Sequence, residues 1–171
     1  MVITGKSLTW LAVAAIAAIA LGSWLVWSRE TPEAKVKAAI REMASCVTKP
    51  AGMKTSAELL KVHTFTGLFA PHCRLALHHA MATGEFTPEE LGSNLVRFFN
   101  MVNRARGAVE EIEVTLQGPD RATAEFTGIL SGEDRFGNTF EERRELRTEL
   151  VRDEDGHWLI ALVEIRNLVE R

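Results

Sequence analysis

Hydrophobic positions divide the chain into one unbroken apolar segment and a longer part in which apolar and polar residues alternate at regular intervals. Residues 8–27 contain no charged side chain. A helix of this length rises about 30 Å, which matches the hydrocarbon core of a bilayer. Trp10 lies near one end, and Trp24 and Trp27 lie at the other, where indole rings favour the headgroup region. We therefore predict a short tail over residues 1–7 and a transmembrane helix over residues 8–27.

A cleaved signal peptide is the alternative interpretation of this segment. Signal peptides have a shorter apolar core, a basic start and a cleavage site of small residues. Here only Lys6 precedes the apolar run, and the run ends in Ser-Trp-Leu-Val-Trp. These features favour an uncleaved anchor.

The pattern after this segment predicts two helices before residue 70. Apolar residues recur at helical spacing over residues 33–47, with Thr31 as the N-cap and Pro32 at the first helical position. Thr55 and Glu58 have the spacing of a capping box, which predicts the start of a second helix. Its expected apolar side consists of Leu59, Leu60, Val62, Phe65 and Phe69.

We treat residues 28–171 as one domain, because their number is that of an ordinary single domain. Within it, residues 28–54 are expected to form the first soluble helix and a linker, and residues 55–171 the remainder. Residues 70–81 fit a short strand and a helix about equally well, and we favour the strand.

A third helix has the clearest local signal of the soluble part. Thr87 is a predicted N-cap, Pro88 takes the first helical position, and Glu90 completes a capping box. We expect this helix to end near residues 104–107. Its expected apolar stripe is Leu91, Leu95, Phe98 and Val102.

After Gly107 the hydrophobic period changes from about 3.6 residues to 2. Four successive strands with short turns are predicted, which is the pattern of an antiparallel meander. Odd positions over residues 141–149 are all charged, so that face of the third strand is expected to be solvated. The last strand, over residues 158–168, is apolar on both faces and is therefore expected to be central in the sheet or covered on both faces.

Helices followed by a meander make an α+β fold. This layout resembles the cone-shaped fold of the nuclear transport factor 2-like superfamily, also called SnoaL-like or cystatin-like. The resemblance implies a domain of helices packed against a curved sheet, in a superfamily of isomerases, dehydratases, transport factors and membrane-tethered assembly subunits that often form dimers. It is carried by the helix over 33–47, the segment from 59 into Phe69-Ala70-Pro71-His72-Cys73-Arg74-Leu75, the start Thr87-Pro88-Glu89-Glu90-Leu91, the charged strand over 140–151 and the ending Gly156-His157-Trp158-Leu159-Ile160.

Enzymes of this superfamily place an Asp or His inside the cone, so we looked for polar residues in the inward register of the expected strands. Glu142 and Arg144 alternate in phase with apolar neighbours, and Glu164 is in phase with Trp158. His79 points inward if its segment is a strand. An ion pair at a wet strand end is the simpler interpretation of Glu142 and Arg144, and an exposed position near the carboxyl end is the simpler interpretation of Glu164. The expected apolar lining of a pocket is Leu75, Leu77, Phe98, Phe126 and Trp158.

The sequence offers few other residues that could form a disulfide, a metal site or a catalytic set. Cys46 and Cys73 are candidates for a structural disulfide, and two buried free thiols are the alternative. The five histidines lack the spacing of a metal site, so we predict no metal, no cofactor and no catalytic set. The net charge of −3, with acidic and basic residues interleaved, argues against a nucleic-acid partner.

Orientation in the membrane follows from two conflicting signals. The basic residues after the apolar run outnumber those before it, which by the positive-inside rule places the domain in the cytoplasm. A short amino-terminal tail followed by one span is also typical of bacterial proteins that hold a domain outside. We favour the extracytoplasmic side.

These observations predict a bacterial-type, single-pass membrane protein whose domain is a non-enzymatic binding or assembly module. Its expected partners are membrane lipid, a second copy of the chain and a protein of a membrane complex. The alternative is a small-molecule enzyme of the isomerase or dehydratase kind, or a lipid-binding protein, that uses the cone as a pocket.

Overall fold

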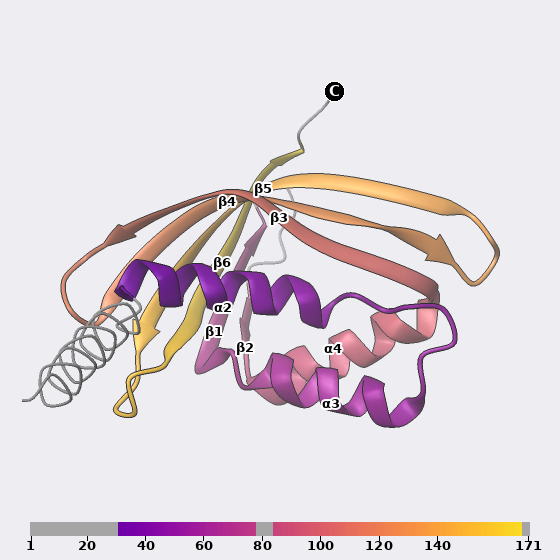
Figure 1. Ribbon diagram of the computed structural model, residues 1–171, viewed down its shortest axis with the longest axis horizontal. Helices are drawn as coiled ribbons and strands as arrows, with labels where there is room; N and C mark the ends of the chain where they lie inside the picture. Colours follow the sequence, from indigo (N-terminus) through magenta and orange to yellow (C-terminus); the bar gives the residue numbers. More distant parts are fainter. Residues whose placement is uncertain (1–30, 78–83, 169–171) are drawn as a thin grey trace, which may run out of the picture. The chain divides into compact units, whose positions relative to one another are not determined.

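The computed structural model describes residues 31–77 and 84–168 (Figure 1). The predicted tail, transmembrane helix and tryptophan anchors lie outside these residues. None of the helices within the described residues combines the length and the hydropathy that a membrane span needs.

Three helices lie on one side of a curved sheet (Figure 1). They are α2 (Pro32–Cys46), α3 (Thr55–Thr66) and α4 (Pro88–Met101). Helix α2 packs against β3, β4 and β6, while α3 and α4 pack against each other. Val36 and Ile40 are fully buried one turn apart on α2, as the helical spacing predicts.

The sheet has six strands in the order β2-β1-β6-β5-β4-β3. All neighbouring strands are antiparallel except β1 and β6, which are parallel. The predicted meander and the central place of the last strand are both confirmed, and so is the strand after residue 69. The strands are β1 (Phe69–Leu77), β2 (Gly84–Phe86), β3 (Val102–Leu116), β4 (Arg121–Asp134), β5 (Thr139–Arg152) and β6 (Trp158–Leu168).

Helix α4 begins as predicted but presents a different face. Thr87 Oγ1 accepts a hydrogen bond from Glu90 N at 3.3 Å, and Glu90 Oε2 accepts one from Thr87 N at 2.9 Å, so the capping box is confirmed. Phe99 is buried and Phe98 is only half-buried, because residues 91, 95 and 99 stack one turn apart. The prediction for Phe98 was therefore wrong. The helix ends at Met101, and β3 starts earlier than the sequence indicated.

Helix α3 differs from its prediction at its start and along its apolar side. Its N-cap is Lys54, which makes no side-chain cap, so the predicted capping box at Thr55 is not formed. Leu59 and Leu60 are 62% and 66% exposed, and no residue of the helix is buried. Helix α3 thus lies at the surface of the domain, in contact with α4 and α2.

The linker before α3 is tied to the edge strand β3. Lys49 and Ala105 exchange two backbone hydrogen bonds of 2.8 Å. The Lys49 ammonium donates to Phe99 O at 2.6 Å and lies 3.2 Å from the Glu58 carboxylate. Further along β3, a bulge interrupts the pairing with β4 around Glu111, whose φ is +55°.

Candidate functional site

The interior between the helices and the sheet face turned towards them, here called the inner face, is occupied by apolar side chains. Phe126 and Trp158 are each 5% exposed and belong to one continuous core cluster, and Leu75 packs against it. Three of the predicted lining residues therefore face the interior, as core residues. The side chain of Leu77 lies outside the described part of the structure.

Among the described residues, no carboxylate, imidazole or amine is buried on the inner face. Thr123 and Thr148 are the buried polar residues of the described part of the chain, and only Thr148 lies on the inner face. Its hydroxyl donates to Ala124 O at 3.5 Å. The candidate His79 lies outside the described residues.

Glu142 and Arg144 share the register of Leu146 and Leu150, as predicted, but they lie where the strand is open to solvent. Their side chains are 57% and 36% exposed and form an ion pair of 3.3 Å. Exposed pairs of this kind contribute little to stability, about 0–1 kcal/mol. The structure thus agrees with the simpler interpretation of a wet ion pair.

Glu164 is on the opposite face from the one predicted. Leu150 pairs with Ile160 while Glu149 pairs with Leu162, so Ala161 is an extra residue in β6. A single extra residue reverses the facing of every later side chain, because strand side chains alternate with a period of two. Val163 consequently packs against the core, and Glu164 lies opposite Arg147 on the outer face. The prediction of an inward Glu164 was therefore wrong.

The outer face carries ion pairs between strands, which fits the predicted solvated face of β5. Arg143 lies 2.7 Å from Glu110, and Arg166 lies 3.1 Å from Glu125. Arg147 is more loosely paired, at 3.9 Å from Glu164, and its Nε is buried without a hydrogen-bond partner.

Cys46 and Cys73 are both buried free thiols, so the disulfide that the sequence allowed is not formed in this structure. Burial raises the pKa of the Cys73 thiol to about 11. Burial also raises the pKa of Cys46, while Lys61 acts in the opposite direction. Both thiols are therefore poor nucleophiles at neutral pH.

The turn before β6 gathers Asp153, Asp155 and His157, whose candidate ligand atoms lie within 4.8 Å of one another. Asp153 accepts a hydrogen bond from His157 N at 2.7 Å, which is the main cause that lowers the pKa of its carboxyl group. The His157 side chain is mostly exposed, as expected. The hydrogen bond that closes this turn accounts for the proximity of the three side chains.

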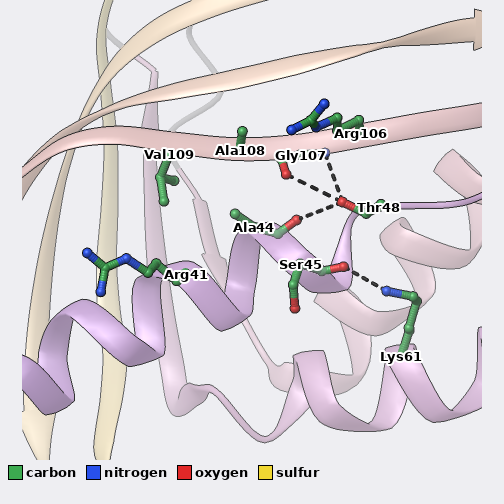
Figure 2. A pocket seen from close by; sticks show the side chains of 9 residues that line it. All are labelled: Arg41, Ala44, Ser45, Thr48, Lys61, Arg106, Gly107, Ala108 and Val109. Carbon is green, nitrogen blue, oxygen red and sulfur yellow. Dashed lines mark hydrogen bonds between the residues drawn. The ribbon is translucent and has the colours of Figure 1, made fainter.

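A groove of about 510 Å³ runs along the end of α2, between α3 and β3 (Figure 2). Thr48 joins its two walls, since its hydroxyl accepts from Gly107 N at 3.0 Å. A Cβ at residue 107 would collide with Ala44 O and with the Val47 side chain, so glycine permits this close approach. The groove lies outside the cone interior in which the sequence placed a pocket.

Sequence reasoning missed the basic residues of this groove. Arg41, Lys61 and Arg106 line it from α2, α3 and β3 respectively. They are far apart in the sequence, and each one alone has the pattern of a solvated surface residue. Gly107 and Ala108, two small residues within a strand, were the available signal for a close approach of another element.

No protein-family model and no curated protein matches the chain. Solved structures do match. A putative scytalone dehydratase from Novosphingobium aromaticivorans has a TM-score of 0.61 and 8% identity, covering 80% of this chain and 83% of that one. A ketosteroid isomerase-like protein from Erwinia carotovora atroseptica has a TM-score of 0.53 and 15% identity, covering 68% and 88%.

A protein with a cystatin-like fold from Nostoc punctiforme has a TM-score of 0.55 and 14% identity, covering 77% of this chain and 86% of that one. Identities this low carry the fold and not the activity. Together with the helices and the six-stranded sheet, these similarities show that the chain has the α+β fold of these structures, which one of them describes as cystatin-like.

Proposed function

We propose that this protein is a single-pass membrane protein whose domain is a non-enzymatic binding or assembly module that acts through its surface. The apolar segment over residues 8–27 supports the membrane anchor. The extracytoplasmic side, pairing of two copies and a partner protein in a membrane complex all belong to this proposal as predictions.

The observation that carries the non-enzymatic part is the occupied cone interior. Enzymes that use such an interior need a pocket of several hundred Å³ with a group placed to transfer a proton. Here Phe126, Leu150 and Trp158 belong to a continuous apolar cluster in the same space. The described inner face offers a threonine hydroxyl as its buried polar group.

A second candidate function is a small-molecule enzyme or a lipid-binding protein. It is favoured by the structural similarity to a putative scytalone dehydratase and to a ketosteroid isomerase-like protein. Under this alternative the interior opens, and Phe126 lines a pocket instead of filling a core.

Truncation of Phe126 separates the two candidates. In a filled core, Phe126→Ala is expected to lower the free energy of unfolding of the full-length chain by about 3–5 kcal/mol. Leu60→Ala is the control, because the Leu60 side chain is 66% exposed, and we expect a change within about 0.5 kcal/mol. Urea unfolding followed by tryptophan fluorescence measures both.

The alternative makes the opposite prediction for this pair of variants. A side chain that lines an open pocket makes few packing contacts, so its truncation removes little stability. Phe126→Ala as stable as Leu60→Ala would therefore contradict the proposed function and favour a pocket.

A further inference from the structure

The turn between β4 and β5 carries the most exposed large apolar side chain among the described residues. Phe136 is 90% exposed in this turn, whereas phenylalanine is among the residues most often buried. A second exposed apolar residue is adjacent, because Arg135 N donates a hydrogen bond to Met101 O at 3.1 Å and Met101 is 61% exposed. The end of α4 and residues 135–137 therefore form one apolar projection, here called the tip.

Hydrogen bonds hold the tip in one conformation. One oxygen of the Asp134 carboxylate accepts from Phe136 N at 2.8 Å and from Asn138 N at 2.9 Å. The other oxygen accepts from Asn138 Nδ2 at 2.9 Å. Gly137 supplies the positive φ of +85° that this turn requires. A fixed backbone therefore presents the Phe136 ring to solvent, and little conformational freedom is lost when the ring binds.

The acidic groups of the tip have partners within the domain, and two of its cations do not. Glu133 lies 3.1 Å from Arg104, and the Asp134 carboxylate is occupied by the turn. Arg135 is exposed in the turn, and Arg97 is exposed on the face of α4 that carries its last residue. Neither makes an ion pair with another described residue. The tip thus offers two apolar side chains and two cations to a partner.

We propose that the tip inserts into the surface of a lipid bilayer that contains acidic lipids. The Phe136 ring and the Met101 thioether enter the boundary between headgroups and acyl chains, and the two arginines reach the lipid phosphates. A protein partner fits the tip less well, because specific protein interfaces bury about 800 Å² on each side and a single turn is small for that. A bilayer requires no matching surface of this size.

This inference rests on the proposed function, because the predicted anchor brings the domain close to a bilayer. Residues 28–31 join the predicted span to α2, and four extended residues reach at most about 14 Å. Contact with lipid is then an intramolecular event at high effective concentration, so a shallow insertion suffices. Figure 1 shows α2 beginning near one end of the domain and the β4–β5 turn at the other. Lipid contact at the tip would therefore hold the domain lengthwise along the bilayer.

A fluorescent reporter beside the tip tests this contact. Full-length Thr139→Cys protein is labelled with nitrobenzoxadiazole and placed in phosphatidylcholine vesicles with and without phosphatidylglycerol. Thr139 is exposed while Cys46 and Cys73 are buried, so the label attaches at residue 139. Quenching of the label by a nitroxide on the lipid headgroup is measured. We expect stronger quenching in the vesicles with phosphatidylglycerol, because anionic lipids attract the arginines.

Two substitutions of exposed apolar residues distinguish the tip from the rest of the surface. On the labelled Thr139→Cys background, Phe136→Ser is expected to reduce quenching at least about twofold, because the ring no longer inserts. Leu60→Ser is the matched control and should leave quenching unchanged, since Leu60 is 66% exposed on α3. Circular dichroism checks that both variants are folded.

Three results would overturn the inference. They are a label that is not quenched in either kind of vesicle, equal quenching in the two kinds, and equal quenching in Phe136→Ser and Leu60→Ser. Flotation of the labelled protein with the vesicles tests the anchor separately. A chain that floats without quenching contradicts this inference alone, whereas a chain that does not float contradicts the proposed anchor and this inference together.

Discussion

The two cysteines illustrate how burial decides the chemistry of a side chain. Their positions in the sequence allow either a disulfide or two free thiols, because spacing alone says nothing about the distance between them in the fold. Cys73 is fully buried on β1, and burial raises the pKa of its thiol from the ordinary value of 9.0 to about 11. Its neutral form is therefore favoured in the folded protein over a wide range of pH.

A pH-dependent loss of stability follows from this shift. Between about pH 9 and pH 11 the Cys73 thiol ionises in the unfolded chain and stays protonated in the folded one, so the free energy of unfolding should fall as pH rises. Urea unfolding of the wild type and of Cys73→Ala at about pH 8 and pH 10.5 measures this. The wild type should lose more stability than the variant.

The variant also serves as its own control for packing. The cavity that Cys73→Ala leaves costs the same at both pH values and cancels in the difference. Equal losses in the two proteins would mean that the folded thiol ionises near its ordinary pKa.

At the scale of helices and strands, the sequence predicted best the elements whose ends carry capping residues. The start of α4 was predictable because the Thr87 and Glu90 side chains accept hydrogen bonds from its first backbone amides, and because Pro88 at the first helical position has no amide to satisfy. Residues Thr55 and Glu58 carry a similar signal, but α3 starts at Thr55 with Lys54 as its N-cap, so tertiary context overrode it. The sheet face on which Glu164 lies was not predictable. The extra residue, Ala161, is itself apolar, so the apolar pattern of β6 shows no break at that point.

The contact between α2 and β3 gives a prediction at this scale. Gly107→Ala is expected to destabilise the protein by about 1–3 kcal/mol, because the added Cβ meets Ala44 O and the Val47 side chain. Gly67→Ala is the matched control, since the atom nearest to its added Cβ is Thr64 O at 3.4 Å. Denaturant midpoints of the two variants measure the difference, and coinciding midpoints would rule out a tight contact at residue 107.

For the molecule as a whole, most of the layout of helices and meander was predictable from the change of hydrophobic period after Gly107. The parallel pairing of β1 with β6 was not, because it joins segments about ninety residues apart (from 69–77 to 158–168) that carry no local mark of each other. The groove was unpredictable for the same reason. Only the fold brings Arg41, Lys61 and Arg106 to one place.

The proposed anchor gives a prediction for the complete chain. Full-length protein should remain in the membrane pellet after alkaline carbonate washing, because an apolar run of this length stays in the bilayer. A variant that lacks residues 1–30 should appear in the supernatant. Recovery of the intact chain in the supernatant, with its first thirty residues verified by mass spectrometry, would refute the anchor.

The long strand β3 forms one border of the sheet, and such borders invite pairing with other chains. Here Lys49 already occupies the backbone groups of Ala105, and Thr48 occupies the amide of Gly107. Beyond them the bulge at Glu111 bends the strand among further acidic residues. Growth of fibrils by strand addition is therefore disfavoured on this side. Under the proposed membrane anchor, this protects copies of the chain that the membrane brings close together.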